Sequence, residues 1–469
     1  MDPFVVELPF GNALDWTFWV NLFSLPSNEL VKALFAIGGW AIIALIFFFM
    51  GAEMWIEVRR AKHTANWKWV LLAVDVPPEQ IQSPKAVEQI FAQLSGALLT
   101  PNFGQKYWYG WKQKWFSLEI ISIEGYIQFL IYTEAQFRDL VEAAVYAQYP
   151  MAEITEVEDY TSVLSSSFPN KDHDIVGLEF GLSAPDAYPV RTYEEFEHSV
   201  TKDYQFNDPM AAILENFARI GAGENLWLHI IIEPTGDGWK QVGIDLVKGI
   251  VAQKKSVAKQ FFLFKFLSVL FTEILTAINP PATPAKPEKK KEETPGKISD
   301  LTPGMKDTVS AVEDKISKVG FKSKVRVLYV ARQEVFNPSK CMEGFVGSMN
   351  QFNYGGRNSL TVKLGTFASY AFKNYRIGYL KQKFATAFKK RKIKIGKNPY
   401  ILNIEELATI WHFPMPLVKT PLLQKTASKR AEPPINLPVE AIESPLKKIG
   451  VKEEQTPAKP EQPPEVMYG

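Results

Sequence analysis

The sequence predicts an α+β protein: a single N-terminal transmembrane helix, two ferredoxin-like α/β lobes and a disordered C-terminal tail. Three observations support this prediction. The run Ala33–Ala52 holds twenty residues without a charge, and a helix of that length spans about 30 Å, the hydrocarbon thickness of a bilayer. The order strand–helix–strand–strand–helix–strand over 66–160 is the split βαβ pattern. Residues 421–469 are dominated by Lys, Glu and Pro, a composition typical of disorder.

Charges on either side of the apolar run predict its orientation. Acidic residues and no base precede Lys32, whereas Arg59, Arg60, Lys62 and Lys68 follow the run. By the positive-inside rule, 1–29 is an extracytoplasmic N-terminus, 30–60 is the anchor helix, and the C-terminal body is cytoplasmic. The sequence therefore predicts a single-pass protein of the inner (cytoplasmic) membrane, so the membrane itself is one of its predicted partners.

The first lobe is predicted over 66–160. Its helices are expected to begin at Ser83-Pro84, a cap followed by proline, and after Thr133. Four β-rich runs bounded by Pro, Gly or polar residues predict its strands: Lys68–Val76, Phe116–Ser122, Tyr126–Tyr132 and Ala152–Val157. Glu124-Gly125 marks the hairpin between the second and third strands.

The next region, 161–278, is predicted to extend this lobe with two strands, Asp174–Leu182 and Leu226–Glu233, and a helix capped by Asp208. It closes with an apolar helix over 261–278 that carries Lys265 and Glu273. This helix is expected to lie on the inner leaflet, to pack against another protein or to cross the membrane. Residues 279–300 form a linker rich in Pro, Lys and Glu.

The second α/β lobe is predicted over 301–420, with a strand at Lys322–Ala331 and a short helix capped by Asn403 with Glu406 in a capping box. Its segment 373–397 contains ten bases and no acid, interleaved with Tyr and Phe. This segment is expected to be a solvated helix face, a nucleic-acid site or an anionic-lipid site. The candidate basic patch is Lys389, Lys390, Arg391 and Lys392.

Catalytic motifs are absent from the sequence. The chain has no phosphate-binding loop, no GxSxG, no HExxH and no CxxC, and its one cysteine and five histidines show no metal-ligand spacing. The balance of 53 basic and 51 acidic side chains gives little net field. The sequence predicts no catalytic, cofactor or metal site and a protein that is not an enzyme. An enzyme whose residues form no local motif is the competing hypothesis.

Several phrases together resemble a known bacterial module. These phrases are WFSLEIISIEGYIQFLIYT, DPMAAILENFARIGAGENLWLHIIIEP, RVLYVARQEVFN, LNIEELATIWHFP and EPPINLP. The module, of unknown function, is membrane-anchored and precedes the motor domain of coupling ATPases related to type IV secretion and conjugation. The resemblance covers roughly 30–438 and implies membrane anchoring and the lobe arrangement. The motor's residues are absent, so ATP hydrolysis is not implied.

These observations predict a non-enzymatic inner-membrane subunit of a machine resembling type IV secretion or conjugation systems. It would anchor or dock a P-loop ATPase or another secretion subunit in trans. The candidate docking segment lies where a motor would attach: Glu405, Glu406, Leu407, His412, Phe413 and Pro414. The alternative is a membrane-tethered protein that binds nucleic acid or anionic lipid through 373–397. Oligomerisation is compatible with either hypothesis.

Overall fold

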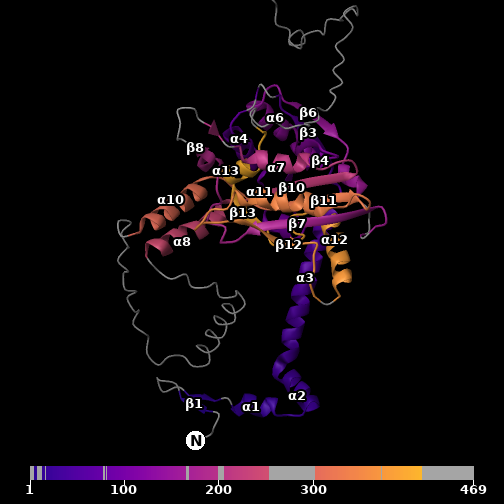
Figure 1. Cartoon of the computed structure of the whole chain (residues 1–469). Helices are drawn as coiled ribbons and strands as arrows, with labels where there is room; N and C mark the ends of the chain where they lie inside the picture. The colour runs from indigo at the N-terminus through magenta and orange to yellow at the C-terminus, as the bar shows by residue number, and fades with distance from the viewer. Residues whose placement is uncertain are drawn as a thin grey trace, which may run out of the picture. The chain divides into compact units, whose positions relative to one another are not determined.

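A computed structural model describes most of the chain (Figure 1). The described residues are 5–7, 13–15, 17–77, 80, 82–164, 168, 170–198, 205–206, 208–252, 301–370 and 372–414. The predicted apolar helix at 261–278, the linker up to residue 300 and the tail at 421–469 lie outside them.

The predicted α+β class is confirmed, with a mostly antiparallel sheet. In the described part of the chain, nine strands form one sheet in the order β12-β7-β11-β10-β4-β5-β3-β6, and β13 pairs with β11. The strands are β3 (Trp69–Asp75), β4 (Phe116–Ile123), β5 (Tyr126–Glu134), β6 (Glu153–Val157), β7 (His173–Leu182), β10 (Glu224–Pro234), β11 (Gly320–Arg332), β12 (Leu360–Gly365) and β13 (Tyr400–Asn403). The regions predicted as separate lobes therefore contribute to one continuous sheet.

The sheet has two halves with the same strand order. In the first, β3 to β6 are arranged β4-β5-β3-β6, and in the second, β7, β10, β11 and β12 are arranged β10-β11-β7-β12. In both halves, counted along the chain, the order is second–third–first–fourth. The halves meet where β4 pairs antiparallel with β10, with Leu118 opposite Ile230. The two small hairpins outside this sheet are β1 (Val5–Glu7) with β2 (Ala13–Asp15) and β8 (Glu197–His198) with β9 (Gln205–Phe206).

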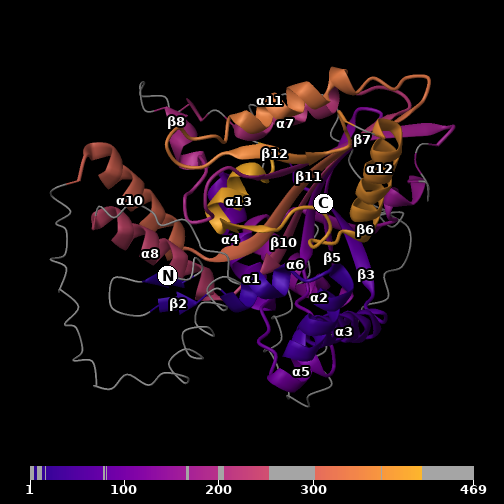
Figure 2. The same cartoon turned by 90° about the horizontal axis from the view of Figure 1, so that it is seen from below.

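Helices cover both faces of the sheet because side chains alternate along each strand. Leu72 belongs to a core built with α4 (Pro84–Leu94), α6 (Arg138–Gln148), α7 (Pro209–Ala218), α11 (Met342–Asn350) and α13 (Ile404–Ile410). The neighbouring Leu71 belongs to a second core, on the opposite face, with α12 (Lys373–Lys390). Figure 2 shows α7 and α11 side by side, and α8 (Lys240–Val251) beside α10 (Pro303–Ser317).

The predicted membrane anchor is contradicted. Among the described residues, no helix combines the length and the apolar character needed to cross a bilayer. The charge-free run is kinked at Gly38, whose φ is 99°, within a π-helical turn (Phe35–Gly39) that lies between α2 (Ser27–Leu34) and α3 (Trp40–Thr64). The apolar part of α3 ends at Ala52, so it measures only about 20 Å at 1.5 Å per residue. The predicted single-pass inner-membrane localisation, with its outside N-terminus, is therefore wrong.

The charged end of α3 is fastened to the body. Arg59 Nε donates a hydrogen bond of 2.6 Å to the Trp108 carbonyl, just after α5 (Phe103–Tyr107). Gly110 passes so close that a Cβ there would lie 2.3 Å from the Arg59 carbonyl carbon, and its φ is +72°. Trp55 contacts the Trp108 ring with centroids 6.2 Å apart. These contacts hold the charged end of α3 against the body. The helix that precedes α2 in the chain is α1 (Thr17–Phe23).

Candidate functional site

The candidate docking segment is buried. Asn403 caps α13 in the predicted capping box: its side chain accepts from the Glu406 N–H, and the Glu406 carboxylate accepts from the Asn403 N–H. Glu406 and Leu407 are 0% exposed, Glu405 is 7% and Phe413 is 3% exposed, and Pro414 is buried too. The segment packs on its own body, so these side chains present no surface to a partner.

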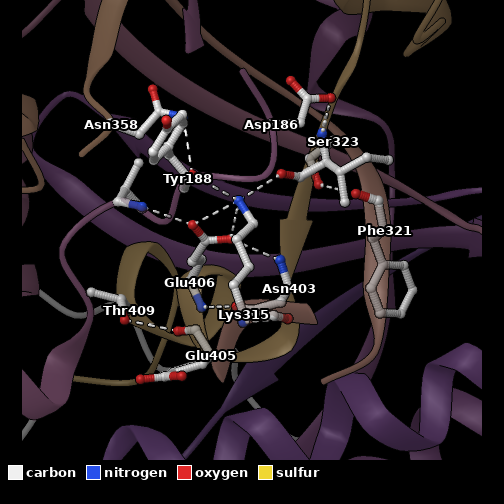
Figure 3. Close-up of polar contacts among 12 residues, drawn as sticks. Asp186, Tyr188, Lys315, Phe321, Ser323, Asn358, Asn403, Glu405, Glu406 and Thr409 are labelled. Carbon is white, nitrogen blue, oxygen red and sulfur yellow. Dashed lines mark hydrogen bonds and ion pairs between the residues drawn. The ribbon is translucent and has the colours of Figure 1, made fainter. Parts of the chain in front are cut away.

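A buried ion pair at this segment holds three elements together (Figure 3). Lys315 of α10 points its ammonium at Glu406 of α13, with both carboxylate oxygens 3.0 Å from Nζ. The same Nζ donates to the carbonyls of Tyr188 and Ile401, each at 3.2 Å. The Glu406 carboxylate also accepts from the Val190 N–H at 2.8 Å. Burial raises the pKa of Glu406, and the Lys315 charge partly offsets that rise.

The end of the segment is held by His412 and aromatic rings. His412 Nε2 lies 2.9 Å from Asp208, the N-cap of α7, and its Nδ1 lies 2.8 Å from the Ala408 carbonyl. Phe413 contacts the rings of Phe129 and Tyr149, with centroids 5.4 and 5.2 Å apart. The ELAT…HFP motif therefore ties α7, α13 and the sheet together.

A polar cleft of about 330 Å³ lies beside the Lys315–Glu406 pair. Its acids are mostly engaged: Arg357 pairs with Glu195 at 2.9 Å and with Asp307 at 2.8 Å, and Lys318 pairs with Glu405 at 2.6 Å. Burial raises the pKa of Glu195. No group of three His, Cys, Asp or Glu in the described residues could hold a metal ion. The charges of the cleft join α10, α13 and the 193–196 turn.

The candidate basic patch is split between the surface and the interior. Lys389, Lys390 and Lys392 are exposed, whereas Arg391 is 0% exposed. Arg391 donates to both Glu119 oxygens, at 2.6 and 3.1 Å, and to Asp159, at 2.7 and 3.0 Å. Arg391 is therefore a structural cation that fastens the end of α12 to the sheet, and only the three lysines present charge to solvent.

The Glu119 carboxylate that accepts from Arg391 belongs to a polar network in which Glu119 and His229 are fully buried and Tyr160 is half-buried. The Tyr160 hydroxyl donates to Glu119 Oε2 at 2.7 Å and also contacts His229 Nε2. Burial lowers the pKa of His229 to about 3, so the imidazole is neutral at physiological pH. Burial alone would raise the pKa of Glu119, but the nearby Arg391 charge brings it below its ordinary value. The network lies inside the fold between β4, β10 and the end of α12.

Sequence reasoning missed this network because its members lie far apart along the chain, with 272 positions between Glu119 and Arg391. A local signal was present. Glu119 interrupts the apolar strand FSLEIISI, and His229 interrupts LWLHIII. A lone ionisable side chain in a strand buried on both faces indicates a buried partner.

The apolar half of α3 is exposed on all sides. Phe47, Phe48 and Phe49 are 67%, 69% and 59% exposed. Consecutive helical residues point about 100° apart, so these three rings face three different directions. Met50 and Met54 continue the surface at 60% and 70% exposure. Among the described residues, α3 carries more exposed large apolar side chains than any other helix or strand.

No protein-family model matches the chain, and no curated protein is significantly similar to it.

Proposed function

We propose that this chain is a non-enzymatic docking subunit of a machine resembling type IV secretion or conjugation systems. The observation that carries the proposal is the exposed apolar half of α3. Its charged half is fastened to the body through Arg59 and Gly110, so the apolar half is presented from a fixed base. The protein would act by binding a partner there and holding it against the α+β body.

The geometry of the α3 surface favours a helical partner. A helix that is apolar all round must be surrounded to be buried, and one flat surface would cover only one of the rings Phe47, Phe48 and Phe49. Two or more apolar helices packed around α3 would cover all three. Burying one Phe side chain contributes roughly 1.5–3 kcal/mol, so three rings supply a substantial part of a docking free energy.

The partner is proposed from the resemblance. The module that the sequence resembles lies ahead of a coupling-ATPase motor, so a P-loop ATPase or another secretion-type subunit is the partner that we propose. The docking surface differs from the one predicted from sequence, because Glu405 and its neighbours up to Pro414 are buried. That segment would stabilise the body instead.

We further propose that each half of the sheet is a ferredoxin-like unit. The support is the shared strand order, with α4 and α7 following the first strand of each half and α6 and α11 following the third. The antiparallel pairing of β4 with β10 would then join two such units edge to edge.

Site-specific photocross-linking in intact cells tests the docking function. A photoreactive amino acid replaces Phe48 in the affinity-tagged full chain, and adducts are identified by mass spectrometry. A P-loop ATPase or secretion-type subunit is expected among the adducts, because Phe48 is 69% exposed in the middle of the apolar surface.

The matched control carries the same photoreactive group at Tyr126, an exposed aromatic position at the start of β5. The partner should be absent from its adducts. Adducts at Phe48 that contain only lipid, or only a second copy of this chain, would contradict the proposal. Equal capture of the partner at both positions would place the docking surface elsewhere.

A further inference from the structure

The start of α12 and the segment before it present aromatic rings to solvent. Phe367, Tyr370, Phe372, Tyr375 and Tyr379 are 65%, 63%, 83%, 79% and 61% exposed. Tyr375 and Tyr379 stand one helical turn apart, about 6 Å along the axis, on the same side of the helix. A segment that contacts only water gains nothing from exposed aromatic rings, so five of them within thirteen residues indicate a binding surface.

The opposite side of α12 is fixed against the sheet. Phe384 and Phe388 are buried, and Phe388 lies over His229 with ring centroids 4.3 Å apart. Gly177 of β7 leaves room for Phe384, since a Cβ there would lie 2.4 Å from the ring. The burial of these residues determines which side of α12 faces outward.

Cations accompany the exposed rings. Lys373, Lys389 and Lys390 are exposed, and within the described residues no carboxylate pairs with them. Arg376 stacks on Tyr370, with Cζ 4.0 Å from the ring centroid. Two other bases of the segment are engaged, Lys381 with Asp174 and Lys394 with Glu57. The exposed lysines of α12 therefore lie at its two ends, about 25 Å apart at 1.5 Å per residue.

We propose that this aromatic-basic face binds single-stranded nucleic acid. The face consists of Phe367, Tyr370, Phe372, Tyr375, Arg376, Tyr379, Lys389 and Lys390. Unpaired bases would stack on the exposed rings, and backbone phosphates would pair with the lysines and Arg376. DNA and RNA share this chemistry. The proposal does not depend on docking at α3.

The composition of the face favours single strands over duplex and over lipid. Bases in a duplex are stacked on each other and leave no free face for a protein ring, so exposed tyrosines suit unpaired bases. Among the described residues of 366–390, the large exposed apolar side chains are all Phe or Tyr, with no Leu, Ile, Val or Met. Helices that lie in a bilayer interface typically carry Trp, Phe and Leu together on their apolar side, and this face has neither an exposed Trp nor an exposed Leu.

Fluorescence anisotropy with the full chain tests the proposal. The probes are labelled oligo-dT and oligo-rU of about 15 nucleotides and a duplex of the same length. Both single strands should bind, and the duplex should bind at least about tenfold more weakly. The double variant Tyr375→Ala/Tyr379→Ala should weaken single-strand binding about 100-fold, since one stacked base is worth about tenfold. Lys389→Gln/Lys390→Gln should reduce the salt slope by about 1.4, at roughly 0.7 per phosphate.

Matched controls separate stacking and charge from general effects. Tyr126→Ala removes an exposed ring elsewhere, and Lys85→Gln/Lys306→Gln removes two exposed lysines on α4 and α10; neither should change binding more than about twofold. The target side chains are exposed, so all variants should fold like the wild type by circular dichroism. Unchanged binding by Tyr375→Ala/Tyr379→Ala, duplex binding as tight as single-strand binding, or binding to anionic vesicles without oligonucleotide binding would each overturn the proposal.

Discussion

Replacing Lys315 with Met should destabilise the fold in a pH-dependent way. The variant leaves the Glu406 carboxylate buried and 0% exposed without its cation. An unpaired buried carboxylate takes up a proton, so the penalty is limited by the free energy of protonation. With an ordinary pKa of 4.5, protonation at pH 7 costs about 3.4 kcal/mol, and at pH 5 about 0.9 kcal/mol.

The direction of the pH dependence follows from the linkage between proton binding and folding. In the variant the folded-state pKa of Glu406 is raised above its unfolded value, so the pH-dependent part of the penalty is absent below about pH 4.5 and grows as the pH rises. The unfolding free energy that Lys315→Met loses relative to the wild type should therefore be larger at pH 7 than at pH 5. The increase is at most about 2.5 kcal/mol, because the pKa of Glu406 is already raised in the wild type. A further, pH-independent loss of roughly 1–3 kcal/mol comes from the carbonyls of Tyr188 and Ile401, which lose their shared donor.

Urea unfolding followed by circular dichroism at pH 5, 6 and 7 measures this difference. The double variant Lys315→Met/Glu406→Gln removes the ionisable group and should abolish the pH-dependent part. Lys240→Met is the control: its pair with Asp237, whose side chain is 80% exposed, should contribute about 1 kcal/mol or less. A Lys315→Met penalty below about 1 kcal/mol at pH 7, or one equal at pH 5 and 7, would refute the reasoning.

Three further predictions concern the buried network and the base of α3. Between pH 7 and pH 5 the wild type should lose about 2 kcal/mol of unfolding free energy through His229, because burial holds the folded pKa of His229 near 3 and only the unfolded imidazole is protonated in that range. His229→Asn should abolish this part of the loss, which urea unfolding at both pH values checks. Arg391→Met should lower the unfolding free energy by about 3–5 kcal/mol in the same assay at pH 7, since it leaves the buried Glu119 carboxylate without its cation. A loss below 1 kcal/mol would contradict the structural role of Arg391. Gly110→Ala should loosen the base of α3, because its Cβ would overlap the Arg59 backbone, and limited trypsinolysis should then cut at Arg59 at least several-fold faster than in the wild type.

Local patterns were sufficient to predict seven of the nine strands of the sheet, but not the short strands β12 and β13. The run Leu226–Glu233 corresponds to β10 at Glu224–Pro234, and Lys322–Ala331 to β11 at Gly320–Arg332. Asp208-Pro209 begins α7, with the Asp208 side chain accepting from the Met210 N–H. These features depend on residues within a few positions of each other, which is the range over which a single sequence is informative.

The pairing of β4 with β10 could not be predicted in the same way. It brings together Ser117 and Ile231, more than one hundred positions apart, and every strand of the sheet has a similar apolar character. The anchor prediction was wrong for a related reason. Hydropathy over 33–52 does not record that Gly38 adopts a left-handed conformation and divides the run between two helices.

The candidate site shows why residue type alone misassigns charge. Four consecutive bases, Lys389 to Lys392, look equivalent in the sequence, yet Arg391 is 0% exposed while its neighbours are in solvent. Its left-handed φ of 45° ends α12 and turns its side chain toward Glu119, so the backbone at one residue separates structural from available charge. Glu406 is likewise a charged residue that is used inside the fold, in its buried pair with Lys315. Residues that are buried in ion pairs must therefore be excluded before a surface is assigned to binding. The surfaces that remain are the Tyr375–Tyr379 face and the apolar half of α3.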